Sequence, residues 1–119
     1  MQTDWYCLEK LDIDQQGSIA ATVVVPSASP WFSGHFPGDP ILPAIAQLGI
    51  VFEIIQKASE GAIIPKSVHR IKYRRIIRPE EAIHINLVQT KDKPDSFSFQ
   101  SVVGEEVACK GRILTEVAK

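Results

Sequence analysis

This 119-residue sequence has only two cysteines, almost no net charge and no long apolar run. Each of these features argues against a class of protein. The two cysteines, Cys7 and Cys109, stand near opposite ends. The chain is therefore not a disulfide-rich secreted domain, and reduced thiols are favoured over a single bridge. The formal net charge is −1, which argues against a surface built to coat nucleic acid or an anionic membrane.

We expect neither a leader nor a membrane-spanning segment. The opening stretch, MQTDWYCLEK, has no basic region followed by an apolar run, as a signal peptide would. The longest apolar run, residues 41–55, is too short to span a bilayer and contains Gln47 and Glu53. We therefore expect a cytoplasmic protein, folded as a single domain over residues 1–119.

What the sequence does contain is a series of strand-like segments around one long apolar segment. Pro43 and Gly61 bound the apolar segment and are typical start and stop residues of a helix. Its apolar side chains cover most of the helical circumference, so we expect it to be buried on nearly all sides. The predicted helix is 43–59, and the predicted strands are 5–13, 18–26, 67–77, 82–89, 96–103 and 106–115.

This order of segments predicts an α+β fold, in which an antiparallel sheet wraps around one long central helix. A sheet of six or so strands around one helix leaves its edge strands unpaired. We therefore expect a homodimer, or a higher even oligomer, that joins the sheets of two copies edge to edge.

A stiff loop before the helix, residues 27–40, carries His35. Pro37 and Pro40 restrict the backbone there, while Gly34 and Gly38 allow sharp bends. The loop would deliver His35 to the start of the helix, where an imidazole is a natural general base. The residues alone equally allow a histidine that only hydrogen-bonds a carbonyl in a structural turn.

The first turn of the predicted helix offers hydrogen-bond donors beside that histidine. The N–H groups of Ala44, Ile45 and Ala46 have no acceptor inside a helix that starts at Pro43, and the helix dipole adds positive charge at this end. An oxygen that gains negative charge during a reaction could be held there. His35 and Asp39 have no third ligand at a suitable spacing, so no metal site is predicted.

The sequence of this region resembles that of a known family. The stretch FSGHFPGDPILPAIAQL, residues 32–48, is similar to the signature of the 3-hydroxyacyl-acyl-carrier-protein dehydratases, which are thioester dehydrases of the hot dog fold. ILPAIAQL is similar to the dehydratase-like proteins of aryl polyene pathways, and IKYRRIIRPEEAIHI, residues 71–85, resembles the family's third-strand motif. The resemblance implies a dimeric hot dog protein that acts on acyl thioesters in fatty acid or polyketide-type biosynthesis. The acyl chain would be carried on the phosphopantetheine arm of an acyl carrier protein, and no cofactor is implied.

The resemblance also implies roles for individual residues. His35 would be the catalytic base, and the N–H of Ala44 would polarise the thioester carbonyl. The implied substrate-binding residues are Gly34, Phe36, Pro43, Ala44 and Gly49.

One half of the family's catalytic pair is missing. In the family an Asp or Glu stands fourteen residues after the histidine and comes from the partner subunit, but that position here is Gly49. The nearest carboxylate on the helix is Glu53, which lies on the same helical face one turn further on. Glu53 is therefore the candidate catalytic acid, although the same residue could be a capped structural carboxylate or part of a dimer seam.

Two functions remain open on these residues. One is a dehydratase that is slow or specialised, because a positioned general acid contributes about 10²–10⁴-fold to a rate. The other is a catalytically inactive subunit that binds an acyl carrier protein or serves as a scaffold in such a pathway.

A basic segment, KSVHRIKYRRIIR at residues 66–78, is the remaining feature of note. Acyl carrier proteins are acidic, so we hypothesise that this segment contains the carrier-docking contacts. A solvated strand with no partner is the alternative, and a single patch on a chain of this net charge argues against nucleic-acid binding. The candidate docking residues are Arg70, Lys72, Arg74, Arg75 and Arg78.

Overall fold

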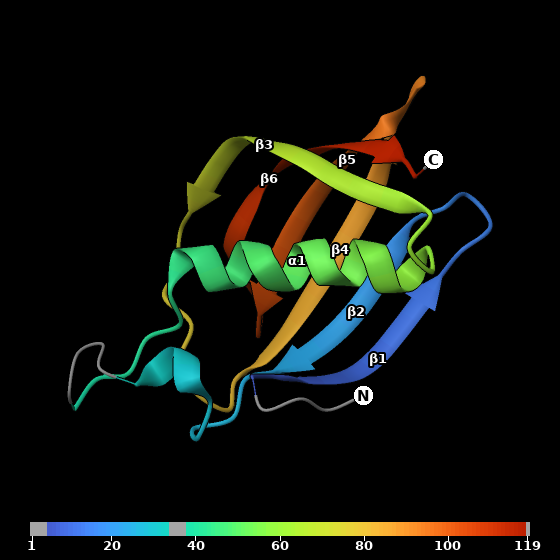
Figure 1. Cartoon of the computed structure of the whole chain (residues 1–119). Coiled ribbons are helices and arrows are strands. Elements are labelled where there is room, and N and C mark those ends of the chain that lie inside the picture. Colours follow the sequence, from blue (N-terminus) through green and yellow to red (C-terminus); the bar gives the residue numbers. More distant parts are fainter. Residues whose placement is uncertain (1–4, 34–37, 119) are drawn as a thin grey trace.

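A computed structural model describes residues 5–33 and 38–118 of the chain (Figure 1). One long helix lies across one face of a curved sheet. The strands are β1 (Cys7–Ile13), β2 (Ile19–Val24), β3 (Ile63–Tyr73), β4 (Ala82–Thr90), β5 (Lys93–Val103) and β6 (Glu106–Val117). The helices are a short 3₁₀ turn, η1 (Pro30–Phe32), and α1 (Ala44–Ala58).

The sheet has six strands in the order β1-β2-β4-β5-β6-β3, and every neighbouring pair is antiparallel. The predicted α+β architecture of a sheet around a central helix is therefore confirmed. Within the described residues, β1 and β3 are the two edges of the sheet. The 11-residue β3 pairs with β6 on one side and leaves its other edge open.

The core lies between α1 and the concave face of the sheet. Alternation in β4 turns Ile83, Ile85 and Leu87 inward, where they are almost fully buried. They join one apolar cluster with Ile50 and Ile54 of α1. Burial of this face, more than helix propensity, stabilises a helix that contains a glycine in its middle.

The helix begins and ends close to the predicted residues. Pro43 is the N-cap residue, and the chain leaves the helix at Gly61, whose φ of +84° suits glycine and whose N–H donates to the carbonyl of Gln56 at 2.8 Å. The expectation of burial on nearly all sides is wrong. Ile45 is 80% exposed and Glu53 is exposed, because the sheet covers only one side of the helix.

The strand β3 differs most from its prediction, because it both begins and ends four residues before the predicted strand, 67–77. Its first residues pair with the end of β6, while Ile77 leaves the sheet and accepts a hydrogen bond from the N–H of Leu42 at 2.8 Å. The ladder is irregular between His69 and Lys72, where Arg70 has a φ of +56°. This bulge interrupts the regular alternation of side chains along β3.

Across residues 5–33 and 38–118, no helix is long and apolar enough to cross a membrane.

Candidate functional site

The predicted base, His35, and its neighbours Gly34 and Phe36 lie outside the described residues, so their roles stay predictions. The described chain resumes at Gly38, and the next residue, Asp39, pairs with Arg78 at 3.4 Å. The loop therefore returns to the helix start beside the segment that follows β3.

The start of α1 presents two backbone donors. No acceptor among the described residues takes the N–H groups of Ala44 and Ile45, as predicted. Ala46 was wrongly included in that prediction, because its N–H donates to the carbonyl of Pro43 at 3.1 Å. Two donors at the positive end of a 15-residue helix form a site suited to a developing negative charge.

A cavity of about 460 Å³ lies at this end of the helix. Besides Pro43 and Ala44, its wall includes Gln47 and the residues that follow β3. Gln47 is 7% exposed, and its Nε2 donates to the carbonyl of Leu42 at 3.4 Å, whereas its buried Oε1 has no partner among the described residues. We call this space the N-terminal cavity; it combines backbone donors with one unsatisfied buried acceptor.

A second cavity, of about 480 Å³, lies further along the helix and contains the position of the missing acid. It is called the aromatic cavity here, and its lining residues are Trp5, Tyr6, Trp31, Gly49, Phe52 and Glu53. A Cβ added at Gly49 would meet no heavy atom within 4 Å, so the glycine faces open space. The structure thus brings Gly49 and the candidate acid Glu53 to the same cavity.

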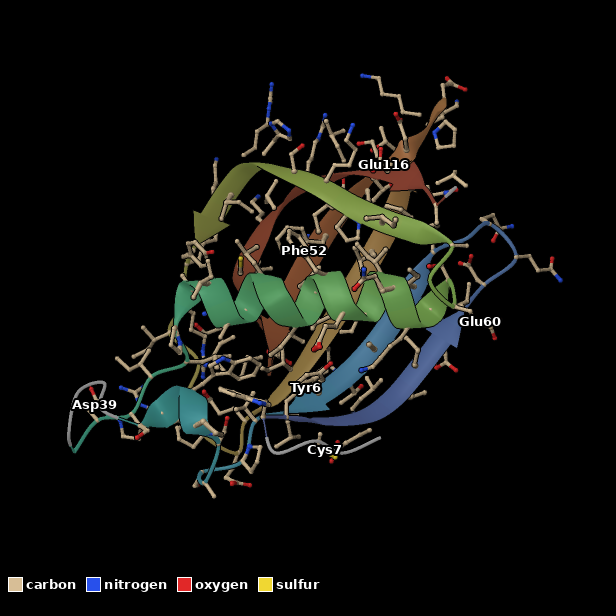
Figure 2. All side chains as sticks on the ribbon, in the orientation of Figure 1. Tyr6, Cys7, Asp39, Phe52, Glu60 and Glu116 are labelled. Carbon is tan, nitrogen blue, oxygen red and sulfur yellow. The ribbon has the colours of Figure 1, made fainter. Side chains whose placement is uncertain are left out.

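The carboxylate of Glu53 is held by a residue that the sequence did not single out. The hydroxyl of Tyr6 donates to Oε1 of Glu53 at 3.0 Å, and Nζ of Lys57 donates to the same hydroxyl at 3.4 Å. Figure 2 shows Tyr6 on the β1 side of α1 and Phe52 on the β3 side, so the cavity spans the open face of the helix. Glu53 is therefore neither a buried carboxylate nor an unconstrained surface one.

Electrostatics keep Tyr6 in its neutral, donating form. Burial, the hydrogen bond to Glu53 and the charge of that carboxylate, in this order, raise the pKa of Tyr6 far above its ordinary value. The ring is 2% exposed and stacks on Trp31, with centroids 6.1 Å apart. The Tyr6 hydroxyl is therefore protonated at neutral pH and faces the Glu53 carboxylate as a donor.

Sequence reasoning missed the aromatic residues of this cavity for a simple reason. Trp5 and Tyr6 read as the beginning of a strand, but the strand starts at Cys7 and both residues precede it. Tyr6 and Glu53 are 47 residues apart, and no local spacing joins them. The one available signal was the pair of aromatics ahead of the strand, which are costly to leave in solvent.

The five basic residues predicted to dock a carrier do not share one surface. Arg75 makes two hydrogen bonds to Glu81, at 3.1 and 2.8 Å, and a further contact to Glu106 at 3.4 Å. Arg78 pairs with Asp39 as described above. These two arginines are engaged within the chain, while Arg74 lines the N-terminal cavity.

Arg70 and Lys72 instead join two cations of β6. They line a groove of about 270 Å³ on the outer face of the sheet with Lys110 and Arg112. Lys72 stands directly opposite Lys110 in the β3–β6 ladder, a like-charge pairing that disfavours the sheet. None of the four takes part in a salt bridge within the described residues, although Asp95 lines a neighbouring pocket with Arg70 and Arg112.

Comparison with known proteins decides the family. The model of the ApeI-like family, described as ApeI dehydratase, matches residues 11–112. The chain belongs to the ApeI-like dehydratase family. It is also 31% identical to the 3-hydroxyacyl-[acyl-carrier-protein] dehydratase FabZ of Rickettsia conorii, over 89% of this chain and 76% of that protein. A FabZ of Caulobacter sp. is likewise 31% identical, over 86% of this chain and 69% of its own length.

Solved structures agree on the fold of this family member. The dehydratase heterocomplex ApeI:P of Xenorhabdus doucetiae superposes with a TM-score of 0.80 at 19% identity, covering 92% of this chain and 96% of that chain. A hypothetical thioesterase of Streptococcus pneumoniae with coenzyme A has a TM-score of 0.64 at 12% identity, covering 95% and 85%. The predicted hot dog fold is confirmed.

Proposed function

We propose that the chain is a 3-hydroxyacyl-thioester dehydratase in which Glu53 takes the place of the acid missing at Gly49. The observation that carries this proposal is the aromatic cavity, because it contains both the vacant family position and a carboxylate held by a tyrosine hydroxyl. Membership of the ApeI-like family supports the reaction class, and the names of the FabZ relatives support a substrate carried on an acyl carrier protein.

The proposed reaction removes water from the 3-hydroxyacyl thioester. His35 takes a proton from C2, and the thioester oxygen is held by the N–H of Ala44 as charge develops on it. The electron pair forms the C2–C3 double bond and the C3–O bond breaks. Glu53 enters the step as the protonated carboxyl group, gives its proton to the departing oxygen and is left as the carboxylate. The products are the enoyl thioester and water.

The two ends of this site cannot come from one chain. Ala44 and Glu53 are nine residues apart on one helix, which separates them by about 14 Å along its axis. The carbonyl oxygen and the 3-hydroxyl of one thioester are only a few bonds apart. We therefore propose a homodimer, joined through the open edge of β3, in which Glu53 of one copy faces the loop and Ala44 of the other.

The cationic groove is the proposed carrier-docking surface. It replaces the predicted set of five residues by Arg70, Lys72, Lys110 and Arg112, with Arg74 nearer the N-terminal cavity. A cluster of four cations that form no salt bridge among the described residues supports docking of an acidic partner, because it raises the rate of encounter with one.

The test is turnover of a 3-hydroxyacyl thioester, followed by the absorbance of the enoyl product. Wild-type protein should turn over, whereas His35→Ala and Glu53→Gln should each be nearly inactive. If the site is shared between copies, unfolding and refolding the two variants together should restore about a quarter of the wild-type rate, because half of the dimers then hold one intact site. Absence of recovery in a mixture shown to contain mixed dimers would contradict the shared site.

The second candidate is a non-catalytic subunit that binds an acyl carrier protein, and the glycine at the acid position favours it. A wild-type chain that binds the acylated carrier but does not turn over its substrate would establish this alternative. The Xenorhabdus doucetiae relative is a dehydratase heterocomplex, so addition of a second dehydratase subunit is the next measurement in that case.

A further inference from the structure

Glu53 lies one helical turn beyond Gly49, the position at which the acid is expected, so its side chain needs to be restrained if it is to act there. Glu53 is exposed on the open face of α1, and a glutamate side chain that is free to rotate loses conformational entropy when it is fixed. A reacting group must be held close to its productive geometry before the substrate arrives. The question is which residues provide that restraint here.

The hydroxyl of Tyr6 provides it, and Lys57 gives the hydroxyl its direction. Lys57 has only donor hydrogens, so its Nζ at 3.4 Å occupies a lone pair of the tyrosine oxygen. The single hydroxyl proton is then left to point at Oε1 of Glu53, 3.0 Å away. Lys57 also lies 5.7 Å from the centre of the Tyr6 ring, which restrains both side chains.

Tyr6 is itself fixed before the substrate arrives. Its ring is parallel to that of Trp31 to within 15°, and Trp31 in turn packs against Trp5 with centroids 5.2 Å apart. All three aromatic rings line the same cavity as Glu53 and Gly49. The carboxylate is thus tied to a rigid aromatic wall, and its second oxygen accepts no hydrogen bond from the described residues.

We propose that Tyr6 is a positioning residue, whose hydroxyl, directed by Lys57, fixes the Glu53 carboxyl group beside the space left by Gly49 for protonation of the leaving hydroxyl. This rests on the proposed function, in which Glu53 is the acid. The new element is that Glu53, although displaced by one helical turn, can protonate the leaving hydroxyl because Tyr6, a residue outside the helix, orients it. Tyr6 acts through Glu53 and does not touch the reacting atoms.

Two measurements on the full chain test this. The first follows ¹³C relaxation of the Glu53 γ-methylene, which reports side-chain order without any substrate. The second compares kcat and KM for the wild type, Tyr6→Phe, Glu53→Gln and the double variant. Tyr6→Phe keeps the ring and its stacking and removes only the hydroxyl. Lys57→Met is paired with Lys91→Met, an exposed lysine in the turn between β4 and β5.

The proposal expects Glu53 to be ordered in the wild type and mobile in Tyr6→Phe. It expects kcat of Tyr6→Phe to fall by about tenfold with KM little changed, as for loss of a hydrogen bond to a charged group. The loss should vanish when Glu53 is already Gln, and Lys57→Met, but not Lys91→Met, should show a smaller fall in kcat.

Equal order of Glu53 in the wild type and Tyr6→Phe would overturn the proposal, as would an undiminished Tyr6→Phe effect in the Glu53→Gln background. A wild-type chain with no turnover would instead overturn the proposed function and, with it, the catalytic purpose of the network. The relaxation measurement then still decides whether Tyr6 orders Glu53, so the two failures are distinguishable.

Discussion

The two cavities along α1 differ in where their polar groups come from. Residues that follow β3 complete the wall of the N-terminal cavity, but its donors, the N–H groups of Ala44 and Ile45, are neighbours in sequence and follow from the helix start itself. The aromatic cavity is made from three separate segments, around Tyr6, Trp31 and Glu53. The first kind of site can be read from a motif, whereas the second exists only once the sheet has closed around the helix.

This difference has a functional consequence. A site made of backbone groups tolerates substitution, since every residue but proline carries an N–H. A site made of a side chain is lost with that side chain. Under the proposed function, Glu53 replaces the acid that is absent at Gly49, and this replacement needs side chains from separate segments to meet in one cavity.

The largest effect expected is on turnover, when the acid is removed from position 53 and then introduced at position 49 of the aromatic cavity. Glu53→Gln should lower turnover by about 10²–10⁴-fold, the usual contribution of a general acid. Adding Gly49→Glu to that variant should restore much of the rate, because the new side chain enters open space at the position that the family uses. The measurement is kcat/KM with a 3-hydroxyacyl thioester.

The matched control is Gln56→Glu in the Glu53→Gln background, which adds the same charge to an exposed position of α1. It should restore nothing. If Gly49→Glu alone creates activity in a chain that otherwise has none, Glu53 is not the acid and the non-catalytic candidate is correct.

The next largest effect concerns the wall of the N-terminal cavity. Leu42 is 1% exposed, so Leu42→Ala should lower the free energy of unfolding by about 2–5 kcal/mol. Val117→Ala, at a side chain that is 77% exposed, should change it by less than about 0.5 kcal/mol. Urea unfolding measures both, and equal losses would show that the core does not extend to this cavity.

Prediction from sequence succeeded where the pattern was local. The alternation of residues predicts β4, and the bounding residues Pro43 and Gly61 predict α1, without information from distant residues. The structure confirms both elements to within a residue or two at each end. The position of β3 failed because Ile63 and Ile77 are equally apolar. Only the pairing with β6 decides which of them enters the sheet.

The sites divided in the same way. Glu53 and Gly49 could be named as candidates because both lie at fixed distances from a motif, and their roles stay predictions. Tyr6 could not be named, since its partner is 47 residues away. The docking set stays a prediction, and a run of cations in sequence does not reveal that Glu81 already binds Arg75.

A smaller effect should follow from the unsatisfied acceptor of the N-terminal cavity. Gln47→Met removes the buried Oε1, which has no partner among the described residues, and loses one long hydrogen bond at 3.4 Å. Relief of the unpaired polar atom is the larger of the two changes, so the free energy of unfolding should rise by about 1 kcal/mol. Gln56→Met, at an exposed position on the same helix, should be nearly neutral, and a clear loss of stability in Gln47→Met would show that the amide is satisfied in solution.

The smallest effect expected is dependent on pH and concerns Glu81, which holds Arg75 in the wall of the N-terminal cavity. The hydrogen bonds from Arg75 lower the pKa of Glu81 in the folded chain, an effect that partial burial opposes and the N–H of Arg78 reinforces. Because the folded pKa lies below the unfolded value of about 4.3, the ionised carboxylate contributes stability above that pH and loses it as the pH falls through the folded pKa. Glu81→Gln should therefore be less stable than wild type at pH 7, and the two unfolding free energies should converge in acid. A difference that stays constant from pH 7 to pH 3 would mean that the ion pair does not stabilise the fold, and that Arg75 is available to a ligand of the cavity.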